Sequence, residues 1–343
     1  MQTHLFNSFL QFTTKPNGRA FALTLASAFK RAGALACTLA MVGCSTTAMR
    51  IGAESPVTGL GKPEMINTAL GKLAVWDSAA QGAPLTTAAA SAPPVVLWPS
   101  IFTDHVIYSS LVAHWQGKRR LILIDGPGHG ASEGPKDKTF TMQACAVAMQ
   151  EILRSKSIAK AVVGGTSWGG LVAGEFAVMY PQMTQGVLLL NTPFFITEGG
   201  ASMGEKMITW GSANVLGTDL FTNGVARAFF LPATREAGGL IMTHFHQNLD
   251  QSDSKALSTA IRSVLIEREP LADKLAQIQA PALIVAGLQD GMYPIEKQRE
   301  AVKRIKFGKL EELDTQHISV VDKPKDVAKL LDAFLDGLVM KAQ

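Results

Sequence analysis

The sequence carries no surplus of either charge once its first 43 residues are set aside. It holds 32 lysines and arginines against 28 aspartates and glutamates, and the first 43 residues contribute four basic residues and no acidic one. The remaining chain therefore has 28 residues of each sign. Binding to nucleic acid depends on basic surfaces that neutralise phosphates. The excess of basic residues belongs to the first 43 residues and is no argument for nucleic-acid binding, and no nucleic-acid partner is expected.

Cysteine is also scarce, with only Cys37, Cys44 and Cys145 in 343 residues. Cys37 lies in the segment that is described below as a targeting leader, and Cys44 is the residue predicted below to carry a lipid. Cys145 would then be the one cysteine with a free thiol in the mature chain. This excludes an intramolecular disulfide, even in an oxidising compartment. Cys145 lies among apolar residues at helical spacing and is predicted to be a small buried hydrophobe.

The N-terminal region lacks an apolar run long enough to cross a bilayer. Its apolar stretch, Ala32 to Val42, is much shorter than the ~20 residues that a membrane span requires. It follows a region whose only charges are basic, and this combination is typical of a signal peptide. We therefore expect residues 1–43 to be a targeting segment.

The apolar stretch ends in Met41-Val42-Gly43-Cys44-Ser45, which resembles a bacterial lipobox with Cys44 as the lipidated residue. Residues 44–66 then read as a tether. The resemblance implies a protein anchored to the membrane through an N-terminal lipid, in the bacterial cell envelope on the periplasmic side of the outer membrane, or free in the periplasm. An ordinary cleaved signal peptide is the alternative.

The glycine-rich stretch in the middle of the chain does not fit a nucleotide-binding loop. Its four glycines between residues 164 and 170 lack the spacing of the dinucleotide fingerprint, and no Lys-Ser or Lys-Thr pair follows as in a Walker loop. The stretch instead contains Gly165-Thr166-Ser167-Trp168-Gly169, between an apolar run and a helix-forming run. A strand, sharp turn and helix of this kind form a nucleophile elbow. Ser167 is the predicted nucleophile.

A serine needs a general base, and the base needs an acid that orients it. In elbow-bearing sheets these residues follow in the order Ser, Asp or Glu, His. Asp290 follows the apolar run Ala282 to Ala286, and His317 follows Leu310 to Asp314. Both therefore lie just beyond the ends of predicted strands, where ligands bind in open α/β sheets. We predict a Ser167, His317 and Asp290 triad.

Other histidines and acids fit these roles less well. His129 lies in a tight Gly/Pro turn and is interpreted as a structural hydrogen-bonding residue. His244 and His246 are two residues apart on a predicted helix and point in different directions, so a packing or solvated role is expected rather than a metal site. Asp314 and Glu198 are the rival acids, and Glu198 also follows a strand end.

Strands and helices alternate through the rest of the chain, which predicts an α/β fold with a mostly parallel central sheet covered by helices on both faces. Residues 67–340 are expected to form one domain. The segment at about 195–267 reads as a mostly helical insertion between two strands. No repeat is evident.

The chain resembles the α/β-hydrolase superfamily from about Leu70 to Leu338, and within it the capped group that includes 3-oxoadipate enol-lactonases and many small esterases. The matching pieces are Asp125 to Ser132, the elbow around Ser167, Leu188 to Pro193, Pro281 to Asp290 and Glu312 to Ser319. The resemblance implies an α/β-hydrolase fold in which the insertion at 195–267 forms a helical cap above the nucleophile.

The sequence departs from this family at the loop after the strand Val95 to Trp98. Family members usually carry His-Gly there, whereas this chain has Pro99-Ser100. The resemblance assigns the first oxyanion-hole donor to the backbone N–H of Ile101, with Phe102 as the next candidate. Trp168, the residue after the nucleophile, supplies the second. Because backbone groups are the donors, the substitution need not abolish the hole.

The cap contains large apolar residues that predict an apolar acyl or alcohol pocket beneath it. They are Met203, Met207, Trp210, Phe221, Phe229, Phe230, Met242 and Phe245. A substrate carboxylate, which a lactonase would bind, could instead meet Arg227, Arg235 or Arg262.

These features predict a serine hydrolase that cleaves a small-molecule carboxylic ester, thioester or lactone through an acyl-enzyme on Ser167. No metal or organic cofactor is expected. An aminopeptidase of the proline-iminopeptidase kind and a carbon–carbon bond hydrolase could use the same triad. A different class of protein, a non-catalytic envelope lipoprotein that retains the fold, is suggested by the altered Pro99-Ser100 loop.

Overall fold

The computed structural model describes residues 51–81, 84–87, 90, 92–135, 139–196 and 203–340. The chain divides into two units, residues 1–46 and 47–343, and every described residue belongs to the second unit. The predicted lipidation site, Cys44, lies outside the described residues. Within the described part of the chain, no helix has both the length and the apolar character needed to cross a bilayer.

An eight-stranded sheet forms the centre of the domain, in the order β1-β2-β4-β3-β5-β6-β7-β8. The β1–β2 and β2–β4 pairs are antiparallel, and all other neighbours are parallel. The strands are β1 Glu64–Thr68, β2 Gly71–Asp77, β3 Val95–Trp98, β4 Leu121–Ile124, β5 Ala161–Thr166, β6 Thr184–Leu190, β7 Ala282–Gly287 and β8 Gly308–Leu313.

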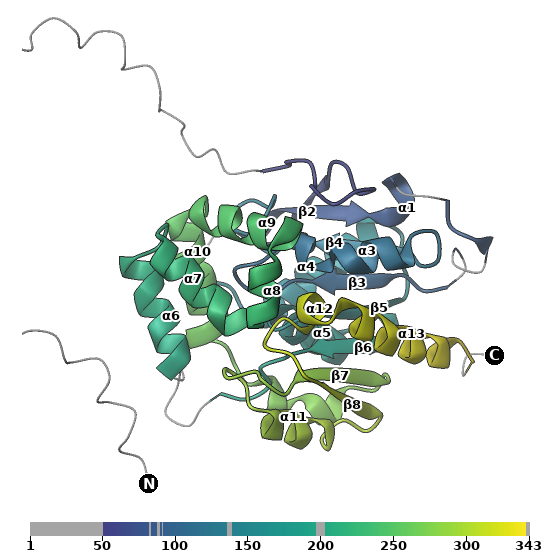
Figure 1. Cartoon of the computed structure of the whole chain (residues 1–343). Helices are drawn as coiled ribbons and strands as arrows, with labels where there is room; N and C mark the ends of the chain where they lie inside the picture. Colours follow the sequence, from purple (N-terminus) through teal and green to yellow (C-terminus); the bar gives the residue numbers. More distant parts are fainter. Residues whose placement is uncertain are drawn as a thin grey trace, which may run out of the picture. The chain divides into compact units, whose positions relative to one another are not determined.

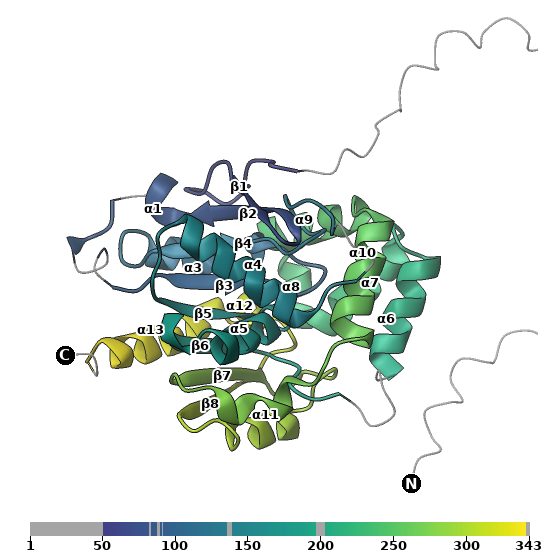
Figure 2. The same cartoon turned by 180° about the vertical axis from the view of Figure 1, so that it is seen from behind.

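Helices cover both faces of this sheet, as the alternating pattern predicts. Figures 1 and 2 show α3 (Ser109–Trp115) and α13 (Pro324–Met340) on one face, with α4 (Met142–Ser155) and α5 (Trp168–Met179) on the other. Strands β3, β4, β5 and β7 are buried along their whole length. Their continuous apolar runs are typical of parallel strands enclosed on both faces. The predicted α/β-hydrolase fold is confirmed.

The remaining described helices are short and lie around the sheet. They are α1 Ser78–Gln81, α11 Ile295–Val302 and α12 Ser319–Asp322, with the 3-10 helices η1 His105–Tyr108, η2 Pro181–Met183, η4 Leu271–Asp273 and η5 Leu275–Gln277.

The segment between β6 and β7 is a helical cap beside the sheet (Figure 1). Its described helices are α6 Met203–Asn214, α7 Asp219–Phe229, α8 Pro232–Ala237, α9 Gly239–Asp250, α10 Ser254–Ile261 and the π-helical turn η3 Arg262–Ile266. Phe221, Phe229, Phe230, Met242 and Phe245 are buried in it. The insertion is therefore helical, as the sequence predicts.

Two apolar cap residues do not follow the prediction of an apolar underside. Met207 and Trp210 on α6 are 66% and 64% exposed. They are three residues apart, so they share one face of the helix, and that face is turned to solvent. The helical period identifies which residues lie together, but not which face meets the core.

Candidate active site

Ser167 lies at a strained turn between β5 and α5. Its backbone has φ 56° and ψ −108°, a conformation that a non-glycine residue rarely adopts. The Ser167 N–H donates to the Leu190 carbonyl at the end of β6, at 2.8 Å. The serine is 4% exposed. Strain of this kind is typical of functional turns, and it is the geometry that the elbow motif predicts.

The glycines on either side of the elbow are required by close packing. A Cβ on Gly165 or on Gly169 would collide with the carbonyl oxygen of Trp98 at the end of β3. The Gly169 N–H also donates to the Pro99 carbonyl at 3.1 Å. The first turn of α5 is thus pressed against the loop that follows β3, which a side chain at either glycine would prevent.

The predicted acid and base are in direct contact. His317 Nδ1 lies 2.7 Å from Asp290 Oδ2, and their side chains are 1% and 2% exposed. The other carboxylate oxygen, Oδ1, accepts the backbone N–H groups of Met292 and Tyr293 at 3.0 and 3.1 Å. A carboxylate held this firmly places the proton of neutral His317 on Nδ1 and leaves Nε2 as the proton acceptor.

The loop that carries His317 is fastened to the end of β6 by Asn191, which has a positive φ of 47°. The Asn191 amide donates to the Gln316 carbonyl at 3.2 Å, and its oxygen accepts the Ser319 N–H at 3.4 Å. Because the Ser167 N–H donates to the carbonyl of Leu190, the nucleophile and the histidine loop are held by the last residue of β6 and by the residue that follows it. The topology therefore brings the elbow and the acid–base pair to one strand end.

No described hydrogen bond joins the Ser167 hydroxyl to His317, although both residues are described. Catalytic hydrogen bonds are often long in unliganded enzymes and shorten when substrate binds. The structure thus places His317 in contact with Asp290 and holds the elbow nearby, but it shows no hydrogen bond between Ser167 and His317.

The loop after β3 lies over the start of α5, so the segments of both predicted oxyanion donors meet. No described backbone hydrogen bond uses the N–H of Ile101 or of Trp168. Phe102 has a positive φ of 66°, which is strained for a bulky residue. Its ring lies 6.0 Å from Phe229, whose ring lies 5.2 Å from His317.

The rival residues that the structure describes have other partners. Asp314 is exposed and accepts a hydrogen bond from the Gln289 amide at 2.6 Å. His129 Nδ1 lies 3.2 Å from the Pro127 carbonyl, and burial lowers the pKa of its imidazole. The remaining rival acid, Glu198, lies outside the described residues.

The sequence does not predict the polar chain that lies beside His317. The Tyr293 ring packs 5.2 Å from the His317 ring, and its hydroxyl donates to Glu205 at 3.1 Å. Burial, reinforced by the charge of Glu205, raises the pKa of Tyr293. Arg268 lies 3.8 Å from Glu205 and donates to the Phe195 carbonyl at 2.9 Å. Its side chain is 2% exposed.

The arginines that were proposed to meet a carboxylate occupy other positions. Arg227 is exposed, Arg262 pairs with Glu267 on the surface, and Arg235 Nε is 3.3 Å from the Phe230 carbonyl. The arginine that is buried here is Arg268, which the sequence analysis does not name. The residues around it form no periodic pattern from which its burial could be predicted.

A second histidine–carboxylate cluster lies at the end of the loop at residues 99–104, which contains the predicted donor Ile101 and is called the oxyanion loop below. One ligand atom from each of Asp104, His105 and Asp125 lies within 4.8 Å of the others, and all three residues are buried. His244 on α9 reaches the same cluster, with Nε2 2.7 Å from Asp104 Oδ2. Among the described residues, this is the group whose ligand types and spacing could hold a metal ion.

Known proteins share this architecture. The sequence matches the family described by the alpha/beta hydrolase fold over residues 93–324. It is 23% identical to 3-oxoadipate enol-lactonase 2 of Acinetobacter baylyi, over 72% of this chain and 90% of that protein. It is 25% identical to Lipase 3 of a Moraxella species, over 64% and 70% of the two chains.

The crystal structure of an enol-lactonase from Burkholderia xenovorans superposes with a TM-score of 0.68 at 22% identity, over 77% of this chain and 96% of that one. This likeness supports the fold. With a family match that runs from β3 to the start of α13, and an elbow on the expected strand, the chain belongs to the α/β-hydrolase-fold family.

Proposed function

We propose that this protein is a serine hydrolase that cleaves carboxylic esters, thioesters or lactones through an acyl-enzyme on Ser167. The observation that carries the proposal is the buried His317–Asp290 pair at 2.7 Å, on a loop that Asn191 ties to the strand end beside the elbow. The membership of the chain in the α/β-hydrolase-fold family supports the same reaction class.

In the proposed reaction the Ser167 oxygen attacks the substrate carbonyl while His317 Nε2 takes its proton. The backbone N–H groups of Ile101 and Trp168 would stabilise the oxyanion of the tetrahedral intermediate. The imidazolium then gives its proton to the leaving alcohol or thiol. Water attacks the acyl-enzyme in the same way, and the proton returns to Ser167 when the acid leaves. Asp290 orients the imidazole and stabilises its charged form.

The substrate class rests on the relatives and on the cap. Proteins named as a lactonase and a lipase align with most of the domain, and structures of esterases share the fold. The rings of Phe102, Phe221 and Phe229 lie together between the oxyanion loop and α7. The Phe229 ring also lies 5.2 Å from the His317 ring, and aromatic side chains this close to the proposed base favour an apolar acyl or alcohol group.

A fluorophosphonate probe tests the nucleophile, and a panel of nitrophenyl esters of graded length tests the substrate class beside a lactone and a proline arylamide. We expect labelling of Ser167 in the wild type and none in Ser167→Ala, with ester turnover that depends on chain length. A folded wild-type protein that neither takes the label nor hydrolyses any of the panel would favour the non-catalytic alternative. Turnover confined to the arylamide would favour the aminopeptidase.

We also propose that residues 1–43 are removed and that a lipid on Cys44 anchors the protein in the cell envelope. The predicted tether at 44–66 is too long, because within its described part Val57 and Leu60 are buried in the core of the domain and Glu64 begins β1. The motif around Cys44 supports this proposal. Cys44→Ser should abolish incorporation of radiolabelled fatty acid in cells, whereas Cys145→Ser should leave it unchanged. Equal incorporation in wild type and Cys44→Ser would contradict the anchor.

A further inference from the structure

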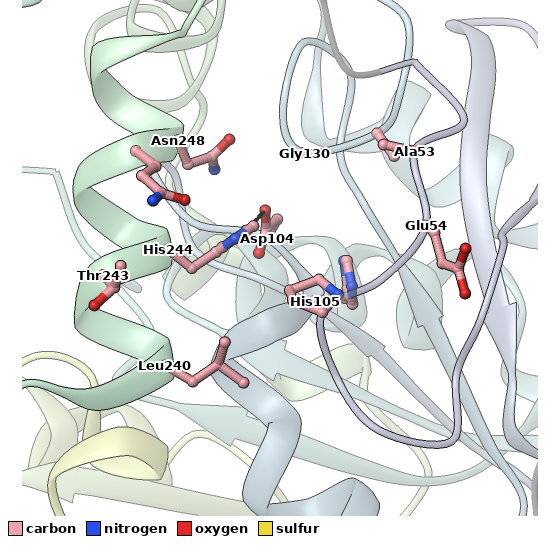
Figure 3. A pocket seen from close by; sticks show the side chains of 12 residues that line it. Ala53, Glu54, Asp104, His105, Gly130, Leu240, Thr243, His244 and Asn248 are labelled. Atoms are coloured by element: carbon pink, nitrogen blue, oxygen red, sulfur yellow. Dashed lines mark hydrogen bonds and ion pairs between the residues drawn. The ribbon is translucent and has the colours of Figure 1, made fainter.

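The oxyanion loop is held between the core and the cap by a series of hydrogen-bonded histidine and aspartate side chains. Figure 3 shows His244 reaching from α9 to Asp104, where Nε2 lies 2.7 Å from Oδ2. The two side chains are 12% and 2% exposed, and they are 140 residues apart in the sequence. This contact joins the cap directly to the segment that follows β3.

Asp104 is rigidly connected to the predicted oxyanion donors. Its second oxygen, Oδ1, accepts the Val106 N–H at 3.0 Å and caps η1. Immediately before Asp104 the loop forms a closed turn, because the Thr103 N–H and hydroxyl both donate to the Ser100 carbonyl, at 3.2 and 2.8 Å. A movement of Asp104 would therefore be passed to Ile101 and Phe102, which lie inside this closed turn.

On the core side, His105 is held by contacts that do not involve the cap. The His105 N–H donates to Asp125 Oδ1 at 2.8 Å, and His105 Nδ1 lies 3.1 Å from the same oxygen. His105 Nε2 lies 2.8 Å from the Ser55 hydroxyl, and its ring stacks on Trp76 with centroids 3.5 Å apart. The core thus holds the end of the loop in place. Among the described residues, His244 is the cap residue that forms a hydrogen bond with the loop.

A cavity of about 320 Å³ opens beside the contact, between α9 and the segment around residues 53–56. The charged and titratable side chains that face His244 there are Asp104, His105 and the exposed Glu54, with Asp125 behind His105. Burial alone would raise the pKa of Asp104, but the hydrogen bond from His244 and the charges of both histidines lower it to about 2. Asp104 is therefore a charged acceptor at neutral pH.

From this geometry we propose that Asp104 and His244 are positioning residues, which hold cap helix α9 against the oxyanion loop so that the loop presents its N–H donors only when the cap is docked. The inference rests on the proposed hydrolase function. It assigns the pair no contact with substrate. A loosened loop would weaken binding of the oxyanion in the transition state more than binding of the substrate itself.

The test is steady-state kinetics of His244→Ala on the best ester of the panel. Loss of one oxyanion donor typically costs about 100-fold to 1000-fold in rate, so a donor that is displaced rather than lost should lower kcat by about 10-fold. KM should change by less than about 2-fold. His244→Gln, whose amide N–H can reach Asp104, should recover most of the lost kcat.

Two control variants separate this role from a general effect on the cap or on folding. His246→Ala changes the same residue type on the same helix, and among its described contacts only a ring contact with Phe245 is lost. His114→Ala breaks another 2.7 Å histidine–aspartate contact, with Asp332, between the half-exposed side chains of α3 and α13. Both should keep wild-type kcat, and all variants are compared at temperatures below their thermal unfolding.

Several outcomes would overturn the proposal. They are a His244→Ala kcat equal to that of His246→Ala, a change confined to KM, and a failure of His244→Gln to recover activity. A fourth is stoichiometric Zn²⁺ binding by the dialysed wild type with a chelator reproducing the His244→Ala defect, which would make the cluster a metal site. If the wild type hydrolyses no ester, thioester or lactone, the proposed function itself fails, and that result is distinct from all four.

Discussion

Two histidine–aspartate pairs with the same 2.7 Å contact distinguish the core of this protein from its cap. His317 and Asp290 both belong to loops at the ends of core strands, and their side chains are 1% and 2% exposed. His244 comes from cap helix α9 and reaches Asp104 in the core, with the histidine 12% exposed beside a cavity. The first pair has no cap residue in its hydrogen bond, whereas the second exists only while the cap is docked. Two contacts of equal length are therefore proposed to have different roles, one in acid–base chemistry and the other in positioning the loop.

The largest effect should come from removing the nucleophile or the base in the core. Ser167→Ala and His317→Ala should each lower kcat by about 10⁴-fold or more, because either change removes the shared covalent and proton-transfer step. Thermal unfolding should be little changed. Residual activity within 10-fold of wild type in either variant would place the chemistry elsewhere.

Breaking the core pair at its acid should have the next largest effect. Asp290→Asn keeps the shape of the side chain but no longer fixes the imidazole tautomer, and we expect kcat to fall by about 10³-fold to 10⁴-fold. The measurement is kcat with the ester used for wild type. Turnover within a few-fold of wild type would show that another acid serves His317, and Glu198→Gln would then be the variant to measure.

A smaller loss is expected when the core pair is left intact but its loop is loosened. Asn191→Ala removes the hydrogen bonds to the Gln316 carbonyl and the Ser319 N–H. One lost buried hydrogen bond costs about 1 kcal/mol, and the same loss of transition-state stabilisation would lower kcat by about 5-fold. Asn191→Asp keeps an oxygen for Ser319 and should lose less. Equal kcat in wild type and Asn191→Ala would show that the loop is held by other contacts.

Breaking the His244–Asp104 pair should lower the free energy of unfolding as well as kcat. The folded pKa of Asp104 is about 2, below its ordinary 3.8, so its stabilisation is present above about pH 4 and is lost as the pH falls through about 2. The difference in free energy of unfolding between wild type and Asp104→Asn should shrink by about 2 kcal/mol on acidification across this range. Denaturant unfolding at several pH values measures it.

The matched control is Asp332→Asn in the partly exposed pair with His114. Burial raises the pKa of Asp332, but the hydrogen bonds from His114 and Trp115 lower it overall. Because this carboxylate is a third exposed, solvent screens the pair, and the pH dependence should be smaller than for Asp104. A larger effect at Asp332 would contradict the contrast between buried and surface pairs.

The sequence predicts the parts of this fold that depend on local patterns. The nucleophile elbow is one contiguous stretch, with an apolar run before Ser167, glycines around it and a helix after it. Its glycines are required because a side chain there would collide with the Trp98 carbonyl. Asp290 could be identified because it follows the apolar strand β7, and His317 because it follows the next strand, β8; the strand ends of a parallel sheet share one edge.

What the sequence does not predict depends on contacts between distant elements. His244 lies on a helix with no local feature that sets it apart from His246, and its partner is 140 residues away. Arg268 and Glu205 approach one another from opposite ends of the cap, and Met207 and Trp210 face solvent although their spacing suits a buried face. Helical periodicity groups residues on one side, but the packing of several helices decides which side is buried.

The central claim is most directly tested by trapping the covalent intermediate. Rapid acid quench of the wild-type protein with a slowly hydrolysed ester, followed by peptide mass spectrometry, should find the acyl group on Ser167, and Asp290→Asn should leave the adduct on the same residue. An acyl group on another side chain, or product formed in a pre-steady-state burst with no adduct on Ser167, would contradict the account.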